Sequence, residues 1–243
     1  MLNRLFLVGV SHVSEESIKL VRKVFKEKDP EIIAIELDEK RFSVILQRIM
    51  NKKTKRTRTK IPSITKVGVK GFLFGTIASF IQRRIGKNLG VSPGSEMEEA
   101  IRLALKHNRR IVLVDKDIDL TLREVSKNFG FKEKINFIVD ILKAPFKREQ
   151  INFDIRKIPD RKVVDEILSR IKSRYPGLYK VLVTDRNRFI AKKLFRVLVD
   201  NPNSKVMAVL GVGHEEAVLK FIRNFENKLS KNQIEFSYSY RVV

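Results

Sequence analysis

The amino-acid sequence predicts an α/β protein with a central, mostly parallel sheet flanked by helices. Short apolar runs at residues 5–10, 32–35, 110–114 and 206–210 have the pattern of buried strands. The first two runs enclose a helical pattern, and strand, helix and strand at this spacing form a βαβ unit. Two of the runs are followed by the same short sequence, glycine-x-x-histidine, which puts polar groups at the carboxyl edge of the sheet.

Apolar spacings of three and four residues, together with capping residues, predict the helices. Ser14 is expected to cap the first helix, and Ser95 the helix that ends at about His107. Prolines interrupt a helical stretch between residues 135 and 179. Further helices are expected at residues 41–50, 121–131, 186–199 and 215–229, with a final strand at 235–241.

The composition fits a folded protein and excludes several kinds of chemistry. A chain of 243 residues with 43% hydrophobic residues can bury a substantial core. It has no cysteine, which excludes disulfides, thiolate nucleophiles and zinc–thiolate sites and suits a cytoplasmic location. The lysine- and glutamate-rich composition is compatible with a thermophile.

The formal net charge of +23 has two interpretations. It attracts anionic partners, either nucleic acid or a membrane surface, or it is simply a lysine-rich solvated surface. The sequence contains no zinc-finger spacing, RNP aromatic pattern or Walker loop to support nucleic-acid binding. The longest apolar stretch, residues 72–81, is too short to cross a bilayer, so the expectation is a cytoplasmic protein, with association at a membrane surface as the alternative.

We expect residues 1–243 to form one domain that carries an insertion at residues 51–91. The insertion opens with a basic run, which predicts a linker. It continues with a glycine-spaced apolar stretch at residues 68–85. That stretch is interpreted as a lid helix on the core, with a homodimer contact or a membrane-surface contact as alternatives.

His12 and His214 are the candidate metal ligands, because each follows a buried strand in a glycine-x-x-histidine turn. Glu36 ends the second strand, which we expect to neighbour the first, and a carboxylate in that position needs a partner. Two imidazoles and one carboxylate would suit zinc, manganese, cobalt or iron and leave a position open for water. The alternative is that each histidine caps a helix or lies satisfied in the core.

Glu96 and Arg186 are the candidate catalytic residues. Glu96 lies in the first turn of a helix and would act as a general base or a ligand, or else only complement the helix dipole. Arg186 opens a long helix and would clamp a substrate carboxylate or an oxyanion, or else form a surface ion pair. Asp117 and Asp119 fit a capped, solvated turn, and His107 fits a helix C-terminus.

Five segments, in order along almost the whole chain, resemble motifs of the TraB/PrgY/Tiki family. They are residues 9–14 (GVSHVS), 36–38 (ELD, with Arg41 following), 93–97 (PGSEM), 115–117 (DKD) and 209–214 (VLGVGH). Two positions depart from the family pattern: Lys116 stands where the family has arginine, and residues 185–187 read Asp-Arg-Asn where it usually has Glu-Arg-Asp. The roles of these positions are therefore open.

The resemblance implies a fold related to the erythromycin esterase and ChaN-like proteins. It also implies a metal-dependent protease that uses the paired glycine-x-x-histidine motifs, and a link to pheromone shutdown through bacterial members. The leading hypothesis is a metal-dependent hydrolase, a peptidase acting on a peptide or protein substrate. The rivals are a non-catalytic peptide-binding or regulatory module and a protein that binds anionic surfaces.

Trypsin should cleave the basic run at residues 52–60 before any other part of the chain. The like charges of the run repel one another, and it has no apolar periodicity that would pack it on a core. Limited digestion followed by mass spectrometry of the first fragments measures this. First cleavage elsewhere, with the run protected, would contradict a linker.

Overall fold

A four-stranded sheet forms the centre of the part of the chain that the structure describes. The computed structural model describes residues 1–11, 15–50, 94–143 and 161–231, except for the side chains of residues 141–143. The strands lie in the order β1-β4-β2-β3, and every neighbouring pair is parallel. Their bounds are β1 Leu5–Val10, β2 Ile32–Ile35, β3 Arg110–Leu113 and β4 Val206–Gly211. The predicted fold class and the four core strands are confirmed.

Helices connect the strands and cover both faces of the sheet. The α-helices are α1 Glu15–Lys28, α2 Glu39–Met50, α4 Ser95–Lys106, α5 Ile118–Asn128, α6 Phe131–Lys143, α7 Arg161–Arg174, α8 Pro176–Tyr179, α9 Arg186–Asp200 and α10 Glu215–Leu229. A short 3-10 helix, Leu2–Arg4, precedes β1, and a π-helical turn, Lys180–Asp185, joins α8 to α9.

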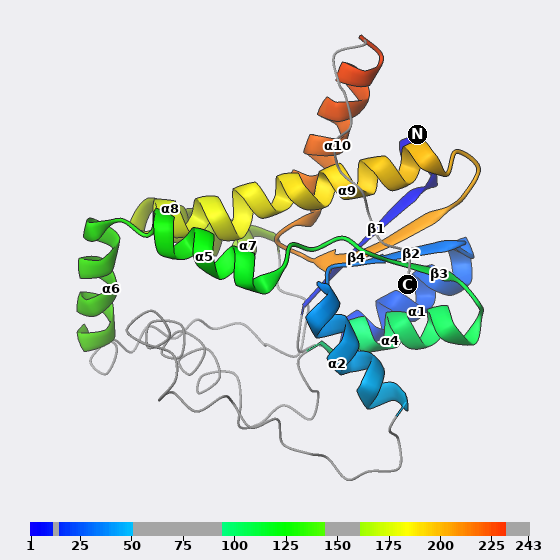
Figure 1. Cartoon of the computed structure of the whole chain (residues 1–243), viewed down its shortest axis with the longest axis horizontal. Helices are drawn as coiled ribbons and strands as arrows, with labels where there is room; N and C mark the ends of the chain where they lie inside the picture. Colours follow the sequence, from blue (N-terminus) through cyan, green and yellow to red (C-terminus); the bar gives the residue numbers. More distant parts are fainter. Residues whose placement is uncertain (12–14, 51–93, 144–160, 232–243) are drawn as a thin grey trace.

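The core consists of two apolar layers, one on each side of the sheet. Alternate strand residues, such as Ile33 and Met207, pack with α1, α2 and α4. The residues between them, such as Ala34 and Ala208, pack with α9 and α10. This alternation is the two-residue period of a strand, and it produces the three-layer arrangement visible in Figure 1. No helix within the described ranges is long and apolar enough to span a membrane.

The strand order corrects one expectation. The second strand does not neighbour the first, because β4 lies between them and pairs with both. The crossover through α1 skips one position in the sheet, and the last strand fills it. The consequence is favourable for a site, because Glu36 at the end of β2 now lies beside the end of β4, which leads to His214.

Several helix starts also differ from the expected ones, and α2 begins at Glu39 instead of residue 41. Helix α5 begins at Ile118 instead of residue 121, because the Asp117 carboxylate accepts the backbone N–H groups of Asp119 and Leu120 at 2.8 and 3.1 Å. Helix α4 begins at Ser95 itself, so Ser95 is not its cap. Gly94 is the N-cap residue, with a φ of 84° that glycine adopts without strain. Ser14, the 51–91 insertion and the 235–241 strand lie outside the described residues.

Candidate functional site

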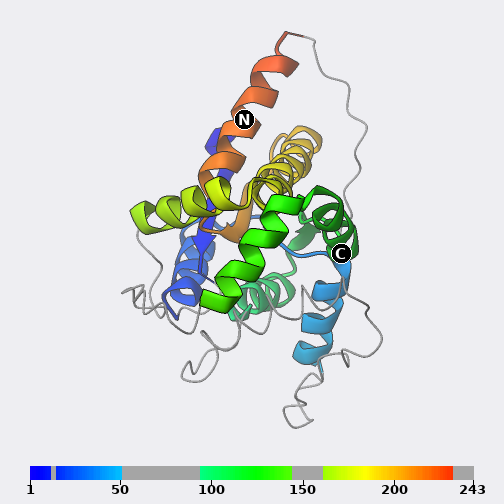
Figure 2. The same ribbon diagram turned by 90° about the vertical axis from the view of Figure 1, so that its left-hand side faces the viewer.

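The candidate site lies at the carboxyl edge of β2, β3 and β4. Glu36 follows β2, Asp115 lies two residues beyond β3, and His214 lies three residues beyond β4. Arg186, the first residue of α9, approaches all three side chains. Figure 2 views the molecule from this side, where helices α5 to α8 stand in front of the sheet. Parallel strands thus gather residues that are far apart in the sequence.

Arg186 is the centre of this group. Its Nε and Nη2 atoms donate to the two oxygens of Asp115 at 2.7 and 2.6 Å, a bidentate pair. Nη2 also donates to Oε1 of Glu36. The side chains of Glu36 and Asp115 are 1% and 2% exposed, so both carboxylates depend on these partners for their charge.

The second Glu36 oxygen is held by the sheet itself. Its Oε2 accepts the backbone N–H of Gly211 at 2.6 Å, and Gly211 is the last residue of β4. The neighbouring strand therefore fixes the carboxylate from one side while Arg186 fixes it from the other. This arrangement explains why a carboxylate can follow the short apolar strand β2. Both side-chain oxygens of Glu36 accept a hydrogen bond.

A second arginine continues the network toward α2. The Nε atom of Arg41 donates to Asp38 at 2.8 Å, and its Nη2 donates to Asp115. Asp38 also accepts the backbone N–H of Arg41 at 2.8 Å and so closes the first turn of α2. Asp115 therefore lies between two guanidinium groups and accepts hydrogen bonds from both.

These contacts determine the protonation of the group. Burial alone would raise the pKa of Asp115, but the hydrogen bonds and charges of Arg186 and Arg41 outweigh it and lower that pKa to about 2. Burial likewise opposes the charge of Arg186, while Asp115 and Glu36 raise its pKa above the ordinary value. Both Asp115 and Arg186 are therefore charged throughout the physiological pH range.

The neighbours of His214 assign its tautomer. Nδ1 contacts Oδ1 of Asn187, an acceptor, so Nδ1 carries the proton. Nε2 lies 3.2 Å from Nη1 of Arg186, and a guanidinium group has only donors, so Nε2 is the acceptor. Nε2 is also 3.6 Å from Oε1 of Glu36. The basic nitrogen of the ring thus faces the charged group, and the buried Asn187 amide holds it there.

A π-helical turn precedes Arg186 and Asn187. Residues Lys180–Asp185 form this turn between α8 and α9. The side chains of Lys180 and Asp185, at the two ends of the turn, pair at 2.7 Å. Such turns are frequent at functional sites, and this one ends where the site residues begin.

The first glycine of the N-terminal motif makes room for a carboxylate. Gly9 lies within β1, inside the strand predicted at residues 5–10, and a Cβ atom there would lie 2.5 Å from Oε2 of Glu215. Glu215 is half-buried, and burial raises its pKa. Because Glu215 directly follows His214, the absence of a side chain at Gly9 lets the end of β1 lie close to the His214 turn.

Three of the predicted site residues, Glu36, Arg186 and His214, lie together in the structure. His12 is outside the described residues. Glu96 is fully buried in the first turn of α4. Within the described ranges, no three histidine or acidic side chains are grouped so that they could hold a metal ion. The role of His12, Glu36 and His214 as a metal triad therefore stays a prediction.

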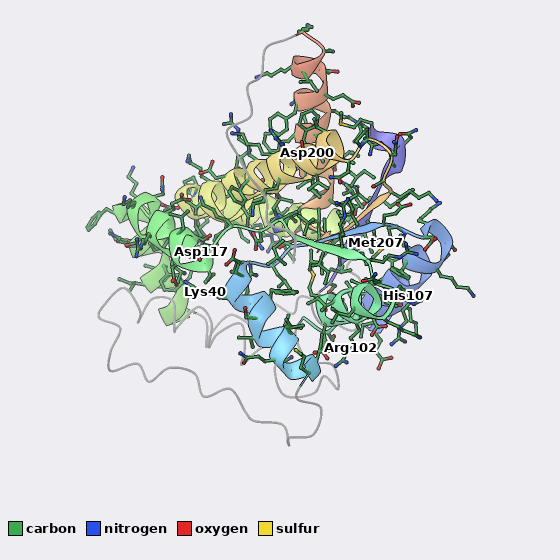
Figure 3. The ribbon with its side chains drawn as sticks, turned by 45° about the vertical axis from the view of Figure 1, so that its right-hand side comes forward. Lys40, Arg102, His107, Asp117, Asp200 and Met207 are labelled. Carbon is green, nitrogen blue, oxygen red and sulfur yellow. The ribbon has the colours of Figure 1, made fainter. Side chains whose placement is uncertain are left out.

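His107 and the Asp117 turn serve structural roles, in agreement with the sequence. His107 is the C-cap residue of α4 and packs on the ring of Phe25 at 5.0 Å. Asp117 caps α5 and lies 3.5 Å from Lys40. Figure 3 shows Asp117 and Lys40 together, with His107 well away toward the other end of the sheet.

Sequence reasoning missed the role of Asn187. Its only signal was the departure from the family pattern at residues 185–187, where asparagine stands in place of an acidic residue. The contact with His214 shows what that position does: it orients the imidazole. An amide does so without a negative charge, which a carboxylate would add.

These features define an α/β protein with a partly buried arginine–carboxylate–histidine centre at the carboxyl edge of a parallel sheet. The chain belongs to the TraB/PrgY/gumN family, whose model matches residues 3–228. The expected family is thereby confirmed, while its kinship with the erythromycin esterase and ChaN-like folds stays a prediction.

The curated relatives are longer proteins. An uncharacterized protein of Methanocaldococcus jannaschii is 36% identical over 226 residues, which cover 92% of this chain and 54% of the relative. TraB domain-containing proteins of mouse and human are each 22% identical over 241 residues, covering 90% of this chain and 62% of theirs. The chain thus spans between about half and two thirds of the length of these relatives.

Asp115→Asn should weaken the fold and reduce its sensitivity to acid. The pKa of Asp115 is about 2 in the folded protein against an ordinary 3.8, so its charge contributes about 2 kcal/mol of stability. Because the folded pKa is depressed, this contribution is complete above pH ~4 and is lost as the pH falls toward 2. Urea unfolding at pH 7, 4 and 2.5 measures it. Asp119→Asn, at an exposed carboxylate, is the control, and equal acid sensitivity in both variants would contradict the assignment.

Asn187→Leu should remove the preference of His214 for a proton on Nδ1. The wild-type ring is expected to carry its proton on Nδ1, and loss of the Asn187 acceptor leaves that proton without a partner. Imidazole ¹⁵N chemical shifts report the tautomer, and the sequence has only three histidines to assign. Asn187→Asp, which keeps an acceptor, should retain the Nδ1 proton. A proton on Nε2 in the wild type would refute the assignment.

Proposed function

We propose that the chain is a metal-dependent hydrolase acting on peptide bonds, with its centre at Glu36, Arg186 and His214. One observation carries the proposal: the Nδ1 atom of His214 is fixed by Asn187, while Nε2 faces the Glu36 carboxylate at 3.6 Å beside a partly buried guanidinium. A basic nitrogen, a carboxylate and a fixed positive charge are the elements of acid–base hydrolysis.

The donor chemistry of Glu36 and His214 fits a divalent cation. Histidine ligands commonly donate their second ring nitrogen to an outer partner, as His214 does to Asn187. His214 and Glu36 would hold the metal together with His12, and the bound metal would supply an activated water. Arg186 donates a hydrogen bond to Oε1 of Glu36 and approaches Nε2 of His214. A metal that took these two atoms as ligands would therefore compete with Arg186 for them.

The protein groups around the centre have separate tasks in this proposal. Arg186 is held in one orientation by its two hydrogen bonds to Asp115, and its fixed charge would stabilise a developing oxyanion. Glu96, fully buried in the first turn of α4, would assist proton transfer. Asn187 keeps Nε2 of His214 in its basic form.

Metal content and melting temperature of wild type, His12→Ala and His214→Ala, each purified without added metal, test the proposal. Each variant should lose metal, because a catalytic site has few protein ligands, and should keep a melting temperature close to that of the wild type. Cleavage of a mixed peptide library by the same samples should fall at least about 100-fold.

His107→Ala is the matched control, since the third histidine of the chain packs on Phe25 at the end of α4. It should keep its metal and its activity. A wild type that takes up no divalent metal under any reconstitution and cleaves no peptide would refute the hydrolase.

A non-catalytic peptide-binding module is the second candidate, and a cavity favours it. This cavity of about 530 Å³ is bounded by Asn187 and Gly213, which flank His214, and by residues of α7 and α10. Its size suits a ligand side chain, and its wall contains both apolar and charged residues. Binding of peptides without turnover, in samples that hold no metal, would favour this candidate.

A further inference from the structure

We infer that the cavity between α2 and α4 is the subsite for an apolar side chain of the peptide. The inference rests on the proposed function, whose substrate class it narrows. This space, called the apolar cavity below, has a volume of about 520 Å³. It is lined by Glu36, Leu37, Lys40, Arg41, Val44, Ile45, Gly94 and Met97.

The apolar cavity adjoins the candidate site, because Glu36 belongs to both. Glu36 lines the cavity, and its buried side chain accepts a hydrogen bond from Arg186. A group bound in the cavity therefore lies next to the residues that would carry out the chemistry. Two of the family-like motifs contribute to its wall, through Glu36, Leu37 and Arg41 from one and Gly94 and Met97 from the other.

The charged residues of the wall already have ionic partners within the protein. Glu36 pairs with Arg186, and Arg41 pairs with Asp38 and Asp115. Lys40 pairs with Asp117 and Asp119. Their charges are thus compensated, and a charged ligand group would have to displace one of these contacts at the cost of its own desolvation.

A ligand in the cavity would contact mainly the apolar residues of the wall. Leu37, Ile45 and Met97 are buried beneath the cavity, and Val44 on α2 is 48% exposed. Met97 can adjust to side chains of different shape. Gly94 adds no side chain to the wall, and a Cβ atom there would meet nothing within 4 Å. Leucine, phenylalanine and similar side chains fit such a space, and their burial favours binding.

Affinity for two blocked decapeptides, identical except for leucine or serine at the centre, tests this inference on the full chain. Fluorescence anisotropy of the labelled peptides at fixed salt gives the affinities. Wild type should bind the leucine peptide about tenfold more tightly, the ratio expected for burying one such side chain. Val44→Asn should lower this preference at least threefold, and Val44→Ile should preserve it.

Leu105→Asn is the matched control, because Leu105 on α4 is 52% exposed and does not line the cavity. It should leave the preference unchanged. Equal affinity of wild type for both peptides, or equal effects of Val44→Asn and Leu105→Asn, would overturn the inference. Mass spectrometry of the peptides after binding separates the two proposals: binding with preference but without cleavage refutes only the hydrolase, and cleavage without preference refutes only the subsite.

Discussion

The structure at the carboxyl edge depends on one partly buried arginine that is shared by two buried carboxylates. Arg186 bonds to both oxygens of Asp115 and to one oxygen of Glu36, and so joins the ends of β2 and β3 to the start of α9. A guanidinium group stays charged at any physiological pH, and burying it without partners would be very costly. The two acids are therefore as necessary to the fold as they are to the proposed chemistry.

The position of β4 turns this ion-pair network into a site. Because β4 lies between β1 and β2, its last N–H reaches Glu36, and the turn that follows it brings His214 to Arg186. Asn187, the next residue of α9, contacts Nδ1 on the other side of the imidazole ring. One helix start thus supplies a partner to each ring nitrogen of the histidine, and the histidine has little freedom to turn.

Much of the fold could be predicted from the sequence, because the strands and helices have clear apolar periods. The apolar run of β2 and the carboxylate at its end indicated both a strand and a site, and Glu36 meets Arg186 and His214 there. Strand order could not be predicted, since it depends on which crossover skips a position, and no local pattern records that. The capping role of Asp117 was predicted, but the start of α5 was placed three residues too late, because the apolar period was taken to begin at Thr121 and not directly after the cap.

The role of Asn187 shows a different limit. A single asparagine near a helix start has no periodicity, and its function arises only when β4 and α9 are brought together. The partners of Arg186 were equally hidden, because 71 residues separate it from Asp115 and 150 separate it from Glu36. Long-range ion pairs of this kind require the topology, not the local sequence.

The π-helical turn before Arg186 has a geometrical consequence for the whole helix. Such a turn holds one residue more than an α-helical turn, so the chain before it is rotated by roughly 100° relative to an uninterrupted helix. Tyr179 and Val183, which lie before or within the turn, thereby share a cavity wall with Asn187, which lies after it. Loss of one residue from Lys180–Asp185 would remove that rotation, and Tyr179 and Val183 would no longer share a cavity wall with Asn187.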